Sequence, residues 1–111
     1  MESSPEKAII VSASISAFNE ARRIAEVVKG ASAYADEIVV IDDGSSDDTA
    51  SLAESAGARV IRQARAGYIA AVKRGVCKAA GRVVVTLDGD GEHRPGDIPT
   101  HDIFRALGGE S

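Results

Sequence analysis

The stretch EIVVIDDGSSDDTASLAESAGARVI, residues 37–61, decides the fold of this chain. It begins with the short apolar run Glu37–Ile41, continues through an acidic loop, and then carries apolar residues at helical spacing over Asp47–Ala56, just before Gly57. A second apolar run follows over Ala58–Ile61. Apolar residues spaced three and four apart mark one face of a helix, and short apolar runs are typical of buried strands. The stretch therefore predicts a strand, a helix and a strand, which is the repeating unit of a parallel sheet.

The same alternation continues on both sides of this stretch. Further strands are expected over Ala8–Ile15 and Arg82–Leu87, and further helices over Asn19–Tyr34, Tyr68–Ala80 and Pro99–Leu107. Nearly continuous apolar strands are typical of a sheet that is buried on both faces. We therefore predict an α/β fold, a Rossmann-like parallel sheet with helices on both faces. Right-handed crossovers would place the carboxyl ends of the strands on one edge, where open α/β sheets bind ligands.

Length, composition and charge restrict the class of protein. The chain has 111 residues, which predicts one domain over residues 8–107 with flexible ends at 1–7 and 108–111. Thirteen basic against seventeen acidic residues give a net charge of -4, which argues against a nucleic-acid partner. One cysteine cannot form an internal disulfide. No apolar run approaches the ~18 residues of a membrane span. We therefore expect a cytoplasmic protein.

Polar loops, which together concentrate acidic side chains, follow three of the predicted strands. They read SAFNEARR (16–23), DDGSSDDT (42–49) and DGDGEHRPGD (88–97), and all three should meet at the carboxyl edge of the sheet. Acidic loops around one crevice suggest a divalent cation, or a sugar or base that carries N–H and O–H donors. The loop after the third strand is basic instead. Its arginines and a nearby lysine could approach a diphosphate, but each is expected to be solvated: Arg62, Arg65 and Lys73.

Asp88 and Asp90 form a D-x-D pair at the end of the fourth strand. Residues i and i+2 of an extended strand point to the same side, so the two carboxylates would repel each other without a cation. Oxygen ligands suit Mg²⁺ or Mn²⁺, and Glu92 or His93 could add a further ligand. A phosphatase of the haloacid dehalogenase type also places D-x-D after an apolar strand, with Asp88 as nucleophile and Asp90 as acid. That interpretation stays open as an alternative.

The loop after the second strand contains two kinds of polar residue. Helix capping explains Ser46, Asp47 and Asp48, which stand at the start of the following helix. It does not explain Asp42 and Asp43, which precede the helix at the end of the strand. Adjacent carboxylates would repel a diphosphate, so a carboxylate here is better suited to accept hydrogen bonds from a nucleobase edge or a ribose hydroxyl.

Together the three loops resemble the N-terminal, nucleotide-binding half of family 2 glycosyltransferases with the GT-A fold, in particular the dolichyl-phosphate-mannose synthase-like group. The matching motifs are ISAFNE (15–20), IDDGSSDDT (41–49) and LDGDGEHRPGDIP (87–99), and the resemblance covers residues 8–99. It implies a domain that binds a UDP- or GDP-linked sugar through Mg²⁺ or Mn²⁺. It also implies transfer of that sugar to a lipid phosphate such as polyprenyl phosphate, or to another acceptor.

The resemblance also implies a role for each matching residue. Nucleotide-binding residues are expected at Ser16, Phe18, Glu20, Asp43 and Asp88. Metal ligands are expected at Asp88, Asp90 and Glu92, with Asp90 as the catalytic residue.

The acceptor-binding half of the family should follow Pro99, where twelve residues remain. This leads to three expectations. The chain is a truncated enzyme, or an enzyme completed by a homo-oligomer or a partner chain, or a non-catalytic module that binds a nucleotide sugar. An enzyme that acts on a lipid phosphate would lie at the periphery of a membrane.

Overall fold

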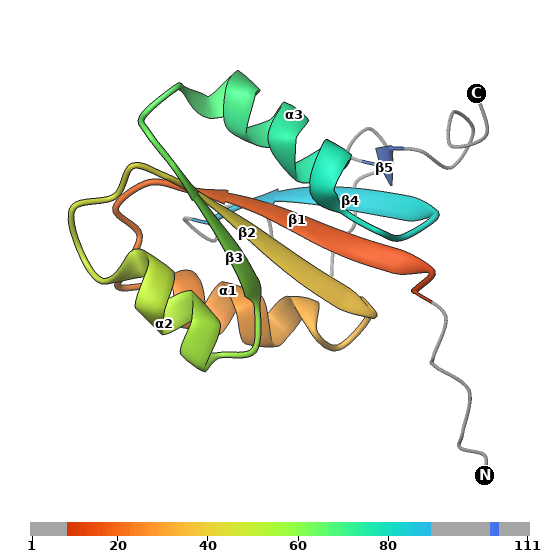
Figure 1. The fold of residues 1–111 in the computed structure, drawn as a ribbon. Coiled ribbons are helices and arrows are strands. Elements are labelled where there is room, and N and C mark those ends of the chain that lie inside the picture. Colours follow the sequence, from red (N-terminus) through yellow and green to blue (C-terminus); the bar gives the residue numbers. More distant parts are fainter. Residues whose placement is uncertain (1–8, 90–102, 105–111) are drawn as a thin grey trace, which may run out of the picture.

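Strands and helices alternate along residues 9–89 and 103–104, which are the residues that the computed structural model describes (Figure 1). The elements are β1 (Val11–Ala17), α1 (Ile24–Ala31), β2 (Glu37–Asp43), α2 (Thr49–Ser55), β3 (Arg59–Gln63), α3 (Tyr68–Lys78), β4 (Val83–Asp88) and β5 (Ile103–Phe104). The predicted α/β alternation is confirmed.

The sheet has the strand order β3-β2-β1-β4-β5, and β1 to β4 run parallel. The chain adds β2 and β3 on one side of β1 and then returns to place β4 on the other side. The strand order therefore reverses between β1 and β4, and such a reversal is where open α/β sheets form their ligand crevice. In the register, Ser16 of β1 lies beside both Ile41 of β2 and Asp88 of β4, so the carboxyl ends of these strands meet at one level.

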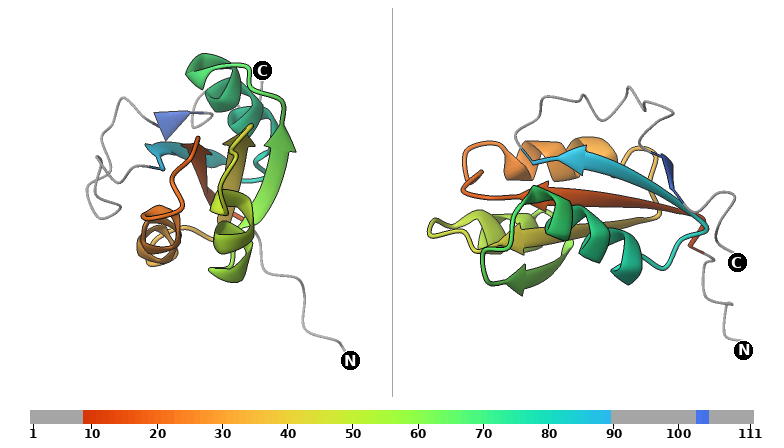
Figure 2. Two further views of the ribbon diagram at one scale, coloured as in Figure 1. Left: turned by 90° about the vertical axis from the view of Figure 1, so that its left-hand side faces the viewer. Right: turned by 90° about the horizontal axis from the view of Figure 1, so that it is seen from above.

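Helices cover both faces of the sheet. Figure 2 shows α1 and α2 on one face and α3 on the other. The side chains of β2 alternate between the two layers: Ile38 and Val40 belong to the larger apolar core, whereas Val39 and Ile41 pack with Ala71 of α3. This alternation is what the period of a β-strand requires.

The α3 face of β1 is lined by the small buried side chains of Ser12, Ser14 and Ser16. They allow α3 to approach the sheet closely at Gly75, where an added Cβ would lie 1.9 Å from Ser14 Oγ. Small residues in the central strand therefore set the distance between α3 and the sheet.

Two predictions about elements were wrong. Residues 99–107 were expected to form a helix, but Ile103 and Phe104 pair antiparallel with Val85 and Val84. This pairing gives the backbone of β4 a hydrogen-bonding partner on its outer side. The spacing of apolar residues within a short segment cannot predict a pairing with a strand that is distant in the sequence. The first helix begins at Ile24, later than expected. None of the helices within the described ranges is long and apolar enough to cross a bilayer.

Candidate functional site

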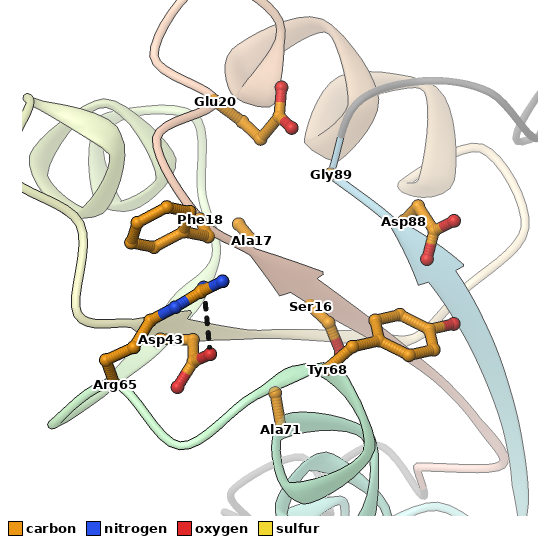
Figure 3. A pocket seen from close by; sticks show the side chains of 10 residues that line it. All are labelled: Ser16, Ala17, Phe18, Glu20, Asp43, Arg65, Tyr68, Ala71, Asp88 and Gly89. Carbon is orange, nitrogen blue, oxygen red and sulfur yellow. Dashed lines mark hydrogen bonds and ion pairs between the residues drawn. The ribbon is translucent and has the colours of Figure 1, made fainter.

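A pocket of about 390 Å³ lies at the carboxyl edge of the sheet. Figure 3 shows the side chains that line it, namely Ser16, Ala17, Phe18, Glu20, Asp43, Arg65, Tyr68, Ala71, Asp88 and Gly89. Five of them were predicted from the sequence as nucleotide-binding residues, and they come from the ends of three different strands and the loop after β1. The structure therefore brings these five residues together. The predicted ligands Asp90 and Glu92 lie outside the described residues.

The pocket has two distinct ends. Phe18, Arg65 and Asp43 lie together at one end, and Asp88 lies at the other (Figure 3). The first end combines an aromatic ring with a carboxylate that has many hydrogen-bond donors around it. The second end holds a carboxylate with one oxygen that has no hydrogen-bond partner among the described residues. The two ends therefore differ in what they could bind.

The loops after β1 and β2 are tied together beside the pocket. The Asn19 backbone N–H donates to Ser45 Oγ at 2.8 Å, and Asn19 Oδ1 accepts from the Ser46 backbone N–H at 2.8 Å. The Glu20 N–H donates to Thr49 Oγ1 at 2.9 Å. Asn19 has a φ of 54°, a left-handed conformation that asparagine adopts more readily than most residues. These contacts fix the backbone that carries Phe18 and Glu20 into the pocket.

Asp42 and Asp47 serve the local structure of the acidic loop. Asp42 Oδ1 accepts from the Ser45 N–H at 3.1 Å. Asp47 Oδ1 accepts from the N–H and the hydroxyl of Thr49, and Asp47 Oδ2 accepts from the Ala21 N–H at 3.2 Å. The hydrogen bond from the Thr49 side chain is the main reason why the pKa of Asp47 is lowered. Asp47 thus satisfies the start of α2, whereas the side chain of the N-cap residue Asp48 makes no capping bond.

Asp43 is buried, with 2% of its surface exposed, and four donors surround its carboxylate. Oδ1 accepts from Gln63 Nε2 at 2.9 Å and from the Ala66 N–H at 2.7 Å. Oδ2 accepts from the Gly67 N–H at 2.9 Å and from Arg65 Nη1 at 3.2 Å. Burial opposes ionisation, but these hydrogen bonds and the Arg65 charge outweigh it, so the pKa of Asp43 is lowered. Asp43 therefore organises the loop between β3 and α3.

Arg65 lines the pocket and is largely exposed, as expected, but its contact with Phe18 was not predicted. Its guanidinium carbon stands 3.5 Å from the centre of the Phe18 ring, while 56% of its side chain remains exposed. Gly44 has a φ of 84°, and a Cβ there would lie 2.9 Å from the Arg65 backbone nitrogen. Arg62, in contrast, is exposed on β3, 3.9 Å from Glu54, and Lys73 is also exposed.

Tyr68, at the start of α3, also lines the pocket, and the sequence did not suggest it as part of the site. The sequence feature that could have indicated both Tyr68 and Arg65 was their position after β3. The residues that follow this strand belong to the same carboxyl edge as the three acidic loops.

Asp88 ends β4 at the point where the strand order reverses. It is half-buried, and its Oδ1 is buried without a hydrogen-bond partner among the described residues. The next residue, Gly89, donates its N–H to the Ser16 carbonyl at 2.8 Å. A Cβ on Gly89 would lie 2.9 Å from that of Ala17, so glycine allows β4 to end close against β1. A buried carboxylate oxygen without a donor suits a cation or a ligand that carries donors.

The described residues hold one member of the predicted metal-ligand set. No three histidine, cysteine, aspartate or glutamate side chains gather into a metal-binding group within these residues. Asp88 is the predicted ligand whose position is known, and the other two lie outside the described ranges.

Comparison with known proteins identifies the family. Residues 12–101 match the glycosyl transferase family 2 model. This chain belongs to glycosyl transferase family 2. It is 35% identical to an undecaprenyl-phosphate 4-deoxy-4-formamido-L-arabinose transferase from Pseudomonas fluorescens, over 88% of this chain and 33% of that protein. It is 30% identical to a dodecaprenyl-phosphate galacturonate synthase from Rhizobium johnstonii, over 86% of this chain and 32% of that protein.

Solved structures agree with this assignment to the family. Glucosyl-3-phosphoglycerate synthase from Mycobacterium tuberculosis, crystallised with Mn²⁺, UDP and glucosyl-3-phosphoglycerate, superposes with a TM-score of 0.66 at 31% identity. The match covers 73% of this chain and 33% of that one. The family 2 chain described here therefore spans about a third of the length of these relatives. The expected GT-A type of fold is confirmed, and the family favours glycosyl transfer over the phosphatase alternative.

Proposed function

We propose that this family 2 domain binds a nucleotide-diphosphate sugar, with UDP as the nucleotide, through Mg²⁺ or Mn²⁺. We propose further that the sugar is transferred to a lipid phosphate. The observation that carries the proposal is the convergence of Phe18, Asp43 and Asp88 in one pocket where the strand order reverses. The M. tuberculosis synthase was crystallised with UDP and Mn²⁺, and also with UDP and Mg²⁺, which supports the choice of nucleotide and metal.

The two ends of the pocket suit the two parts of such a donor. Phe18 offers a ring against which a planar base can pack, and Asp43 offers carboxylate oxygens next to it. Asp88 would face the diphosphate at the other end. The volume of about 390 Å³ lies within the range of pockets that bind small molecules. In this proposal Ser16 and Glu20 complete the wall between the ends.

The donor set at Asp88 fits a divalent cation. Its buried Oδ1 has no donor from the described residues, and carboxylate oxygen is the ligand that Mg²⁺ and Mn²⁺ prefer. We propose that Asp88, Asp90 and Glu92 hold the metal, which when bound would neutralise the charge developing on the leaving diphosphate. The hydrogen bond from the Gly89 N–H to the Ser16 carbonyl fixes the end of β4 next to β1, which supports this role for Asp88.

The proposed acceptor requires little from the protein. A phosphate oxygen of a lipid phosphate is already ionised at neutral pH, so no general base has to remove a proton from it. That oxygen forms a bond to the anomeric carbon while the bond from this carbon to the diphosphate oxygen breaks. The electron pair leaves with UDP. Two relatives are named for polyprenyl-phosphate acceptors, which supports this class of acceptor.

Calorimetric titration tests the binding part of the proposal. We expect UDP to bind in the presence of Mn²⁺ and to bind at least about tenfold more weakly in EDTA, a difference of about 1.4 kcal/mol. Asp88→Asn should remove this dependence on metal. Asp48→Asn is the matched control, because it makes the same change of charge on an exposed side chain outside the pocket. An affinity for UDP that changes neither in EDTA nor in Asp88→Asn would contradict the proposal.

A transfer assay tests the catalytic part. UDP-sugars with a radiolabelled sugar are incubated with undecaprenyl phosphate in detergent and Mn²⁺, and the lipid fraction is counted. Label in the lipid fraction with the unaltered chain, and none with Asp88→Asn, is the expected result. Binding of UDP without transfer or hydrolysis of any UDP-sugar would contradict the catalytic part and favour a binding module.

A further inference from the structure

Arg65 makes the two contacts within the pocket that a nucleobase would be expected to make. Its planar guanidinium stacks on the Phe18 ring, with the central carbon 3.5 Å from the ring centre. Its Nη1 donates a hydrogen bond to Asp43 Oδ2 at 3.2 Å. A nucleobase would use a flat face and a ring N–H in the same way. Figure 3 shows the guanidinium between these two residues, at the end of the pocket where the proposed function places the base.

We propose that Arg65 is an internal competitor for the base, so that a nucleotide must displace its guanidinium from Phe18 and Asp43 in order to bind. This inference rests on the proposed function and goes beyond it. It states that binding of the base requires free energy to break the contacts of Arg65 with Phe18 and Asp43. Arg65 thereby lowers the affinity of a site whose other residues are already in place.

The backbone around Arg65 is anchored independently of its side chain. The N–H groups of Ala66 and Gly67 donate to Asp43 at 2.7 and 2.9 Å. Gly44 packs against the Arg65 backbone so closely that a Cβ would lie 2.9 Å from its nitrogen. More than half of the Arg65 side chain is exposed, so the guanidinium can move into solvent while the loop keeps its shape.

Asp43 is suited to exchange one donor for another. When Arg65 leaves, Gln63 and the backbone of Ala66 and Gly67 still donate three hydrogen bonds to the carboxylate. The bond that is lost, at 3.2 Å, is the longest of the four. It frees one acceptor position on Oδ2, next to the ring face that the guanidinium has also left. A base with a ring N–H can fill both positions at once.

The strength of the competition follows from the two contacts. An exposed cation–π contact and an exposed ion pair of ordinary strength together correspond to about a three- to thirtyfold change in affinity. Removing the guanidinium should therefore raise the affinity for a neutral base by a factor in this range. A charged nucleotide is a less suitable probe, because the loss of a positive charge also weakens its attraction to phosphate.

The test is an NMR titration of the 111-residue chain with uridine. Arg65→Ala should bind uridine about three- to thirtyfold more tightly than the unaltered chain. Arg62→Ala is the matched control, since Arg62 lies on β3 outside the pocket, and it should leave the affinity unchanged. In the unaltered chain, saturation with uridine should remove the ring-current shift that Phe18 imposes on the Arg65 guanidinium protons.

Two results would overturn the inference. Equal or weaker binding of uridine by Arg65→Ala would show that the guanidinium is neutral or supports the base. If neither the unaltered chain nor Arg65→Ala binds uridine, this end of the pocket is not a base site. Titration with UDP in Mn²⁺ separates the inference from the proposed function: UDP binding by the unaltered chain preserves that function even if Arg65 does not compete.

Discussion

Replacement of Asp43 by asparagine should destabilise the fold, because four donors converge on a carboxylate that asparagine can only half replace. The amide retains one acceptor oxygen, so two of the four donors lose their acceptor and face an NH₂ group. Hydrogen bonds to charged groups contribute about 1.5–3 kcal/mol each, whereas the half-exposed Arg65 adds little. Relief from burying a charge offsets part of this loss. We expect Asp43→Asn to lower the free energy of unfolding by about 2–4 kcal/mol.

The pH dependence of this effect has a definite sign. The pKa of Asp43 is lowered in the folded chain, so its ionised form stabilises the fold fully above the unfolded pKa of about 3.9. That stabilisation is lost as the pH falls through the folded pKa. The difference between the unaltered chain and Asp43→Asn should therefore be constant from pH 7 to about pH 5 and shrink below about pH 4.

Urea unfolding followed by circular dichroism measures both effects. Asp42→Asn is the matched control, because Asp42 is buried nearby but accepts one backbone N–H through Oδ1, which an amide oxygen can replace. The control should change the free energy of unfolding by less than about 1 kcal/mol. Equal stability of the two variants would refute the role given to Asp43, as would a difference that persists unchanged into acid.

Three further variants test contacts of the sheet outside the pocket by the same urea assay. Glu37→Gln should lower stability by about 1–2 kcal/mol, because the carboxylate accepts from the Ser12 hydroxyl and the Ala80 N–H and pairs with Arg59; an unchanged midpoint would contradict this. Ser14→Ala should raise stability by about 1 kcal/mol, since the buried Oγ has no partner among the described residues. Gly75→Ala should lower the free energy of unfolding by about 1–3 kcal/mol, because its Cβ would lie 1.9 Å from Ser14 Oγ. The loss should be smaller when Ser14 is also replaced by alanine, since the hydroxyl is then absent. Equal losses with and without Ser14→Ala would disprove the steric clash between the two side chains.

The sequence was sufficient for the parallel sheet because β2 and β4 are buried along most of their length. Each of these two strands is therefore a local apolar run, Glu37–Ile41 and Arg82–Leu87. The order of strands and helices then placed the acidic loops on one edge. The pairing of β5 was beyond this reasoning, because Ile103 and Phe104 become a strand only through contact with Val84 and Val85.

Within the site, the sequence located the carboxylates but did not reveal how each is used. Asp43 and Asp88 both end apolar strands and both line the pocket. The difference between them comes from the β3–α3 loop, whose N–H groups at Ala66 and Gly67 reach back to Asp43. Such donors are invisible in a residue pattern, since every loop has backbone N–H groups. The stacking of Arg65 on Phe18 was not predicted for a related reason: it depends on the fold, which brings the β3–α3 loop next to the loop after β1.

This difference predicts opposite effects of the same substitution at the two ends of the pocket. Asp88 Oδ1 is buried without a donor from the described residues, so its charge is not compensated there as the charge of Asp43 is. Without metal, Asp88→Asn should therefore raise the free energy of unfolding by about 1 kcal/mol, where Asp43→Asn lowers it. With UDP, Mn²⁺ at about ten times its dissociation constant should stabilise the unaltered chain by about 1.4 kcal/mol and leave Asp88→Asn unchanged. If Asp88→Asn instead lowers the free energy of unfolding without metal, the carboxylate of Asp88 stabilises the fold, and this reasoning is refuted.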